Sequence, residues 1–103
     1  MTPFVLTSRA EQDIGDIWDY IAGDSIAAAD RVLESINQAL HRLAKNPGIG
    51  HFREELADRR HRFWLVYSYL IVYRFEPRPL QVIRVLHAAR DVQSILGLPA
   101  ADE

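Results

Sequence analysis

The chain contains no cysteine, one methionine and one lysine among its 103 residues. Without cysteine it forms no disulfide and offers no thiolate ligand to a metal ion. No apolar run approaches the roughly 20 residues that a membrane-spanning helix needs. The opening Met1-Thr2-Pro3 has no basic segment, so we expect no signal peptide. These absences favour a cytoplasmic protein in a reducing compartment, with no membrane association.

The composition that remains is that of one folded domain. Apolar residues make up 49% and charged residues 25% of the chain, as is usual for globular proteins. We expect residues 1–96 to form a single domain and residues 97–103 a flexible tail.

The net charge of −2 is unevenly distributed. Residues 1–50 carry a net charge of −3, whereas residues 51–96 hold eight arginines and carry +3. The basic half suits an anionic partner, although the arginines could equally do no more than solvate a sheet. A dedicated RNA-binding protein is usually basic overall. We therefore expect no direct sequence-specific nucleic-acid binding by this chain alone.

The first half of the chain has the pattern of a strand followed by two helices. Residues 4–7 form a short run typical of a strand. Residues 8–11 have the Ser-x-x-Glu pattern of a capping box, which predicts a helix from Ser8. A second helix is expected between the breaker at residues 23–25 and Lys45, which precedes Asn-Pro-Gly. Both helices are amphipathic, so an antiparallel helical hairpin is predicted.

The second half has the pattern of three antiparallel strands. Residues 62–67, 70–75 and 80–87 are rich in β-branched and aromatic side chains and are separated by short links. Residues 88–96 then predict a short closing helix. The expected fold class is α+β, with an N-terminal strand and a helical hairpin packed on one face of a small antiparallel sheet.

Alternation along these strands predicts a partly basic, partly apolar sheet face. If the register brings the arginines together, this face carries Arg62, Arg74 and Arg84 among Trp64, Val72 and Val82. The opposite face would pack on the hairpin through Phe63, Leu65, Ile71, Tyr73, Phe75, Ile83 and Val85. The first face is the candidate binding surface, unless the closing helix simply covers it.

Residue patterns for metal or nucleophilic chemistry are absent from the sequence. The four histidines are His41, His51, His61 and His87, and no two have metal-ligand spacing on one helix. No P-loop, dinucleotide fingerprint or nucleophile elbow occurs. His87 could act as a general base or could only form structural hydrogen bonds. We expect no metal, no cofactor and no self-sufficient enzyme.

Four segments in order resemble the ParE branch of the ParE/RelE toxin superfamily. They cover nearly the whole chain and run through Leu6–Ile21, Asn46–Leu56, Tyr69–Arg74 and Val82–Asp91. Among them are Asn46-Pro47-Gly48-Ile49-Gly50 and Leu86-His87-Ala88-Ala89-Arg90-Asp91. The resemblance implies the strand, hairpin, sheet and closing helix predicted above.

The resemblance also implies functions that the residues alone do not. Toxins of this kind are held inactive by an antitoxin, here expected to be ParD-like, and the ParE branch inhibits DNA gyrase when released. The RelE branch instead cuts messenger RNA on the ribosome and needs Lys, Arg and often Tyr on the sheet. Here the only lysine, Lys45, lies off the sheet and no tyrosine follows Tyr73. Gyrase inhibition is therefore favoured over a ribonuclease, with a degenerate toxin that only binds its antitoxin as a third possibility.

Two sets of site residues follow from this reasoning. The residues expected to bind the target are Arg62, Arg74, Arg84, His87 and Arg90. The residues expected to bind the antitoxin are Trp64, Val72 and Val82. No catalytic residue is assigned.

Overall fold

The computed structural model describes residues 3–52, 59–76, 78–89 and 92–97. The elements in chain order are β1 (Phe4–Leu6), α1 (Ser8–Ala22), α2 (Ile26–Lys45), a 3-10 turn η1 (Pro47–Ile49), β2 (Arg62–Val66), β3 (Tyr69–Arg74), β4 (Leu80–His87) and α3 (Val92–Leu96). This architecture confirms the predicted α+β class. In the part of the chain described, no helix is long and apolar enough to cross a membrane.

The four strands form one sheet in the order β1-β4-β3-β2. Strands β2, β3 and β4 pair antiparallel, as predicted. Strand β1 pairs parallel with β4, with Phe4 opposite Leu80, so the sheet is mixed and not wholly antiparallel. A parallel pair requires a long connection. Here the helical hairpin, β2 and β3 all lie between the two parallel strands in the chain.

Side chains at the turns begin and end the two long helices. Thr7, one residue before the predicted start, caps α1 by accepting a hydrogen bond from the Ala10 N–H at 3.1 Å. Ser25 caps α2 in the same way at Ala28. One hydrogen bond links the two helices: the Trp18 indole of α1 donates to the Asp30 carboxylate of α2 at 3.0 Å. The predicted hairpin is thus confirmed, with the first cap corrected from Ser8 to Thr7.

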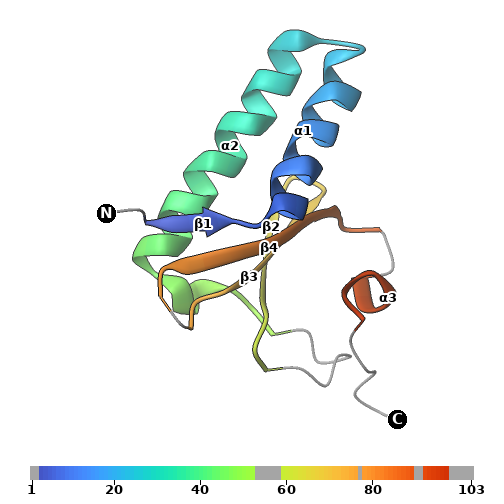
Figure 1. Ribbon diagram of the computed structural model, residues 1–103. Helices are drawn as coiled ribbons and strands as arrows, with labels where there is room; N and C mark the ends of the chain where they lie inside the picture. Colours follow the sequence, from blue (N-terminus) through green and yellow to red (C-terminus); the bar gives the residue numbers. More distant parts are fainter. Residues whose placement is uncertain (1–2, 53–58, 77, 90–91, 98–103) are drawn as a thin grey trace.

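The sheet separates two apolar clusters of unequal size. The helical hairpin covers one face and α3 lies on the other, while the far end of the hairpin extends beyond the sheet (Figure 1). The larger cluster joins α1 and α2 to the sheet through Ala10, Ile36, Ala39, Leu40, Leu43, Ile71, Tyr73, Leu80, Val82 and Val85. The smaller cluster, beneath α3, consists of Phe63, Leu70, Val72, Leu86 and Val92.

The register of β2 against β3 contradicts the predicted division of side chains between the faces. Trp64 lies opposite Ile71 and Phe63 opposite Val72, because β2 and β3 join through the two-residue turn after Val66. The prediction required a register one residue different, and such a shift moves every side chain to the other face. Ile71, Tyr73 and Val85 do pack on the hairpin, but Phe63 lies under α3 and Leu65 is 57% exposed.

An irregularity between β3 and β4 adds to this difference. Val72 pairs with Arg84 and Tyr73 with Val82, so Ile83 is an extra residue in β4. A bulge of this kind interrupts the simple alternation of side chains along a strand. Val82 consequently faces the hairpin while Ile83 joins the cluster under α3.

Candidate functional site

The three strand arginines do not form one basic face. Arg62 pairs with Tyr73, and Arg84 pairs with Val72. Arg62 and Arg74 both line one cavity at the end of β2 and β3, whereas Arg84 contacts α1. The predicted cluster is therefore wrong in its composition, because it was built on the wrong register.

Arg62 is bound to the backbone of the turn that follows α2. Its Nη1 donates to the Gly50 carbonyl at 3.0 Å and to the Gly48 carbonyl at 3.4 Å. Its guanidinium also lies over the rings of Phe52 and Phe75, at 4.3 and 5.2 Å from their centroids. Guanidinium–ring contacts of this geometry are favourable. Arg62 therefore has a structural role in addition to any role in binding.

Tyr73 secures the same turn from inside the hairpin core. Its phenol accepts a hydrogen bond from the Gly50 N–H at 3.0 Å and donates to the Pro47 carbonyl. Burial raises the pKa of Tyr73 above its ordinary value of 10.0, while the Gly50 hydrogen bond and the charge of Arg62 act in the opposite direction. A Cβ on Gly50 would lie 2.1 Å from the phenol oxygen, so this position requires glycine. Tyr73 thus stays protonated near pH 7 and holds the turn through both hydrogen bonds.

Arg84 connects α1 to β4 through an ion pair. Its Nε and Nη2 donate to the two carboxylate oxygens of Asp13 at 2.7 and 3.0 Å. The Val85 N–H donates to the same carboxylate at 3.0 Å. The two charged side chains are only 12% and 13% exposed. Asp13 thereby accepts a backbone N–H of β4 beyond the end of β1, where no described strand pairs with that edge. Its hydrogen bonds to Arg84 also raise the pKa of the Arg84 guanidinium.

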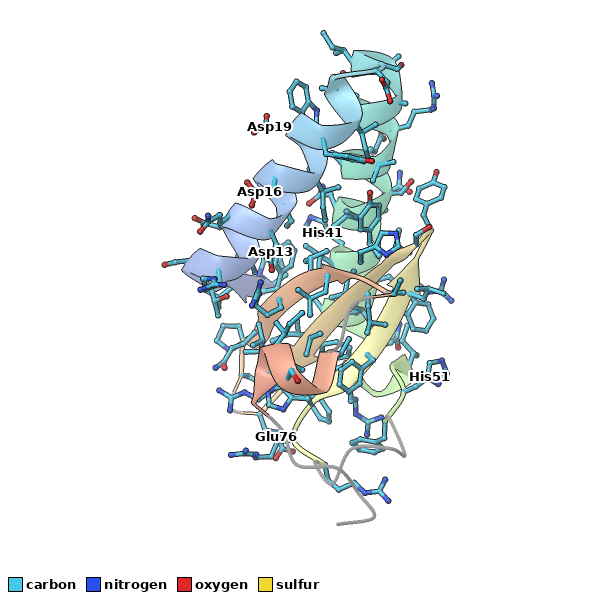
Figure 2. The ribbon with its side chains drawn as sticks, turned by 90° about the vertical axis from the view of Figure 1, so that its right-hand side faces the viewer. Asp13, Asp16, Asp19, His41, His51 and Glu76 are labelled. Atoms are coloured by element: carbon cyan, nitrogen blue, oxygen red, sulfur yellow. The ribbon has the colours of Figure 1, made fainter. Side chains whose placement is uncertain are left out.

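Asp13, Asp16 and Asp19 recur at three-residue spacing along α1. Figure 2 shows Asp13, Asp16 and Asp19 along α1, with Asp13 nearest the sheet. Helical spacing alone does not separate a solvated aspartate from one that reaches a sheet edge. Only the packing of α1 on β4 makes that distinction, so the sequence offered no signal for this role.

A cavity of about 340 Å³ lies at the end of β2 and β3, and we call it the strand-end pocket. It is lined by Phe52, Arg59, Arg60, Arg62, Arg74, Phe75 and Glu76. Figure 2 places Glu76 at the end of the molecule beyond α3. Arg59, Phe52 and Phe75 were not predicted as site residues, because their approach depends on the strand register and on the turn after α2.

His87 is exposed at the end of β4, beside Tyr69. The two rings meet edge to face with centroids 5.7 Å apart, and His87 Nδ1 accepts the Ala89 N–H at 3.2 Å. A second cavity of about 340 Å³ lies between this strand end and α1, lined among others by Asp16, Tyr20 and His87. His87 is thus accessible to a partner. Arg90, also predicted to bind the target, lies outside the described residues.

Only one of the three residues predicted to bind the antitoxin reaches the surface. Val72 and Val82 are both 0% exposed, in the smaller and the larger cluster respectively. Trp64 is half-buried, with Arg42 5.5 Å from its ring centroid and His51 stacked at 5.9 Å. Trp64 is therefore accessible from the surface, whereas the two valines are not.

The described residues bring together no machinery for metal-assisted chemistry. Among residues 3–52, 59–76, 78–89 and 92–97, no three histidine, aspartate or glutamate side chains gather closely enough to hold a metal ion. The cationic side chains of the sheet are dispersed between the strand-end pocket and the Asp13 ion pair. Fold and surface together define a small α+β protein with an arginine-lined cavity at one end of its sheet.

Comparison with known proteins identifies the family. Residues 4–92 match the family described as ParE toxin of type II toxin-antitoxin system, parDE, and the chain belongs to this family. It is 30% identical over 98 residues to Toxin ParE1 of Caulobacter vibrioides, a match that covers 94% of this chain and all of that protein. A chain of the chromosomal ParDE TA system from P. aeruginosa has the same fold. Its TM-score is 0.67 at 18% identity, and the match covers 82% of this chain and 92% of that one.

Proposed function

We propose that this chain is the toxin of a type II toxin–antitoxin pair and is held by a ParD-type antitoxin. We propose further that it inhibits DNA gyrase when it is released. The observation that carries this proposal is the family match over residues 4–92, together with the relative from a ParDE system. The proposed toxin acts by occupying a surface of its target and not by a chemical step.

The placement of the cationic side chains supports binding over RNA cleavage. A ribonuclease of the RelE type must collect proton carriers around the scissile phosphate. Here the carboxylate of Asp13 already engages Arg84, and Arg62 holds the turn after α2. Lys45 ends α2, and the buried Tyr73 phenol has a raised pKa. Arginine also transfers protons poorly because it stays charged.

The proposed antitoxin contact lies along β2, which is an edge strand of the sheet. Leu65 on this strand is 57% exposed and Tyr67, in the turn that follows it, is 61% exposed. Trp64, which is half-buried, precedes Leu65. Exposed apolar side chains beside arginines suit an acidic, amphipathic segment that folds as it binds. Val72 and Val82 would support this surface from within the two cores.

The proposed target contact uses His87, which is exposed, with Arg62 and Arg74 at the strand-end pocket. Arg90, which lies outside the described residues, belongs to the same proposal. Arg84 contributes indirectly, by holding β4 to α1. Charged groups on such a surface steer encounter with an anionic partner and make association sensitive to salt.

Two experiments test the proposed function. The first is co-expression of the chain with the small protein encoded by the neighbouring reading frame, the expected antitoxin. The two proteins should co-purify as a complex. The second is a DNA supercoiling assay, in which micromolar wild-type toxin should inhibit gyrase and His87→Ala should inhibit less. Arg31→Met, which removes an exposed charge from α2, is the control and should inhibit like wild type.

The outcomes separate the candidate functions. Normal supercoiling at micromolar toxin, with a stable antitoxin complex, would reject gyrase inhibition and favour the degenerate toxin. Cleavage of ribosome-bound message after induction, measured by primer extension, would reject the binding mechanism and favour the ribonuclease.

A further inference from the structure

The strand-end pocket combines several arginines with two aromatic rings. Arg62 lies over Phe52 and Phe75, and Arg59 lies over Phe52 at 5.0 Å from its centroid. Arg74 lines the same cavity and donates through Nη2 to Gln81 at 3.1 Å. Contact with the two aromatic rings restricts the guanidinium groups of Arg59 and Arg62. The pocket therefore presents cationic hydrogen-bond donors in defined positions.

Two of these arginines retain unused hydrogen-bond donors. The Nε atoms of Arg62 and Arg74 are buried and have no hydrogen-bond partner within the described part of the chain. Buried donors without an acceptor are rare, because an unmade hydrogen bond to a charged group is costly. The hydrogen bonding of these two guanidinium groups is therefore incomplete, and both are half-buried side chains that line the pocket, where an anionic acceptor could meet their remaining donors.

The surroundings of the pocket distinguish between kinds of anion. Phe52 already has the guanidinium groups of Arg59 and Arg62 over its ring, so this ring offers little surface for stacking a nucleobase. Glu76 also lines the cavity and opposes a densely charged phosphate chain. A single planar carboxylate matches the forked donors of arginine and tolerates one nearby glutamate.

We infer that the strand-end pocket binds a carboxylate side chain of the antitoxin. This inference rests on the proposed function and adds to it the point at which the partner's acidic segment is held. The carboxylate would engage arginines also proposed to contact the target. Neutralisation would then follow from occupation of shared residues.

The experiment measures the affinity of the purified toxin for its co-purifying antitoxin by titration calorimetry at two salt concentrations. The test variant is Arg59→Met, since Arg59 is exposed and the methionine keeps an apolar stem over Phe52. Arg74→Met is a second, independent variant. Arg31→Met, on the second turn of α2, is the matched control for loss of one exposed charge. Thermal denaturation checks that every variant is folded.

The pocket variants should raise the Kd roughly 10- to 100-fold and reduce its dependence on salt. Arg59→Lys should recover only part of the affinity, because lysine keeps the charge but not the planar fork. A double-mutant cycle against Asp→Asn and Glu→Gln changes in the antitoxin should couple Arg59 to one acidic residue. Arg31→Met should bind as wild type does.

Three results would count against the inference in different ways. Equal affinity of Arg59→Met, Arg74→Met and Arg31→Met would overturn the pocket while leaving the antitoxin complex established. Failure of wild type to bind the antitoxin would overturn the proposed function itself. A third result would assign the pocket to nucleic acid: pocket variants that lose binding to a fluorescein-labelled single-stranded oligonucleotide but keep their antitoxin affinity.

Discussion

The two faces of the sheet differ in how much structure covers them. The hairpin face packs against two long helices of 15 and 20 residues, whereas the opposite face is covered by the five residues of α3. Both faces nevertheless contain side chains that are completely buried, such as Ile71 and Val72. Full burial at a position thus does not reveal how much of the fold depends on it.

The difference teaches where stability and function can be separated. Stability should reside mainly in the hairpin core, because more apolar side chains are buried there than under α3. The α3 face and the strand ends have a smaller core and should open more readily. Surfaces available to partners border both regions: Trp64 and the cavity beside His87 lie on the hairpin side, whereas Leu65 lies on the α3 side.

The largest effect is expected from truncation in the hairpin core. Leu43→Ala removes a side chain that is 0% exposed and leaves a cavity between α2 and the sheet. The free energy of unfolding should fall by about 2–5 kcal/mol, as measured by urea denaturation. Leu33→Ala, at a position 40% exposed on the same helix, is the control and should cost clearly less.

The next largest effect is expected where α1 meets the edge of β4. Asp13→Asn removes the charge that pairs with Arg84, which is nearly buried. The unfolding free energy should fall by about 2–3 kcal/mol, because the remaining arginine loses a charged hydrogen-bond partner. Asp16→Asn, exposed on the same helix, should change stability by less than about 0.5 kcal/mol. Equal effects of the two changes would contradict the structural role of Asp13.

An intermediate effect, with a pH dependence, is expected at the turn after α2. Tyr73→Phe leaves the Gly50 N–H and the Pro47 carbonyl without the phenol, which should cost about 1–3 kcal/mol. The pKa of Tyr73 is raised in the folded state. Its contribution is therefore fully present below about pH 10 and is lost as the pH rises through the folded value.

Denaturation between pH 8 and pH 11 measures this dependence. Wild-type stability should decline above about pH 10, and the decline should be smaller in Tyr73→Phe, which has no phenol to ionise. Tyr20→Phe, at a position 82% exposed, should retain the wild-type decline. Identical pH profiles for Tyr73→Phe and wild type would show that the ionisation of Tyr73 does not matter for folding.

The smallest effect is expected under α3. Val92→Ala should cost about 1 kcal/mol, because it removes two methyl groups from a small cluster whose cover is short. Thermal denaturation beside Leu43→Ala gives the direct comparison. A loss at Val92 as large as that at Leu43 would mean that the two faces contribute alike, and the contrast between them would be wrong.

Most of the fold was predictable because it depends on local patterns. The Asn46-Pro47-Gly48 breaker ended α2 at Lys45 as expected, and Ser25 capped it. Apolar side chains at helical spacing, such as Ile36, Leu40 and Leu43, are buried together. The parallel pairing of β1 with β4 was not predicted, because nothing within a three-residue strand indicates its partner.

The candidate site was much less predictable, because it depends on register. Arg62, Arg74 and Arg84 were correctly placed on strands, but a one-residue register and the extra Ile83 separated them. The Asp13 ion pair and the strand-end pocket each join residues far apart in the chain. Neither has a local pattern that could reveal it.

The amino-acid sequence by itself determined the α+β class, the order of the elements and the membership of the toxin family. The fold class and the order of the elements follow from the periodicity of apolar residues, helix caps and turn residues, which act over a few positions along the chain. Family membership follows instead from the match of residues 4–92 to known toxins. Tertiary structure alone decided which side chains share a face, which arginines are held by the fold, and which line a pocket. The physical reason is that a strand's side chains change faces with each residue, so one step in register or one bulge reassigns them all.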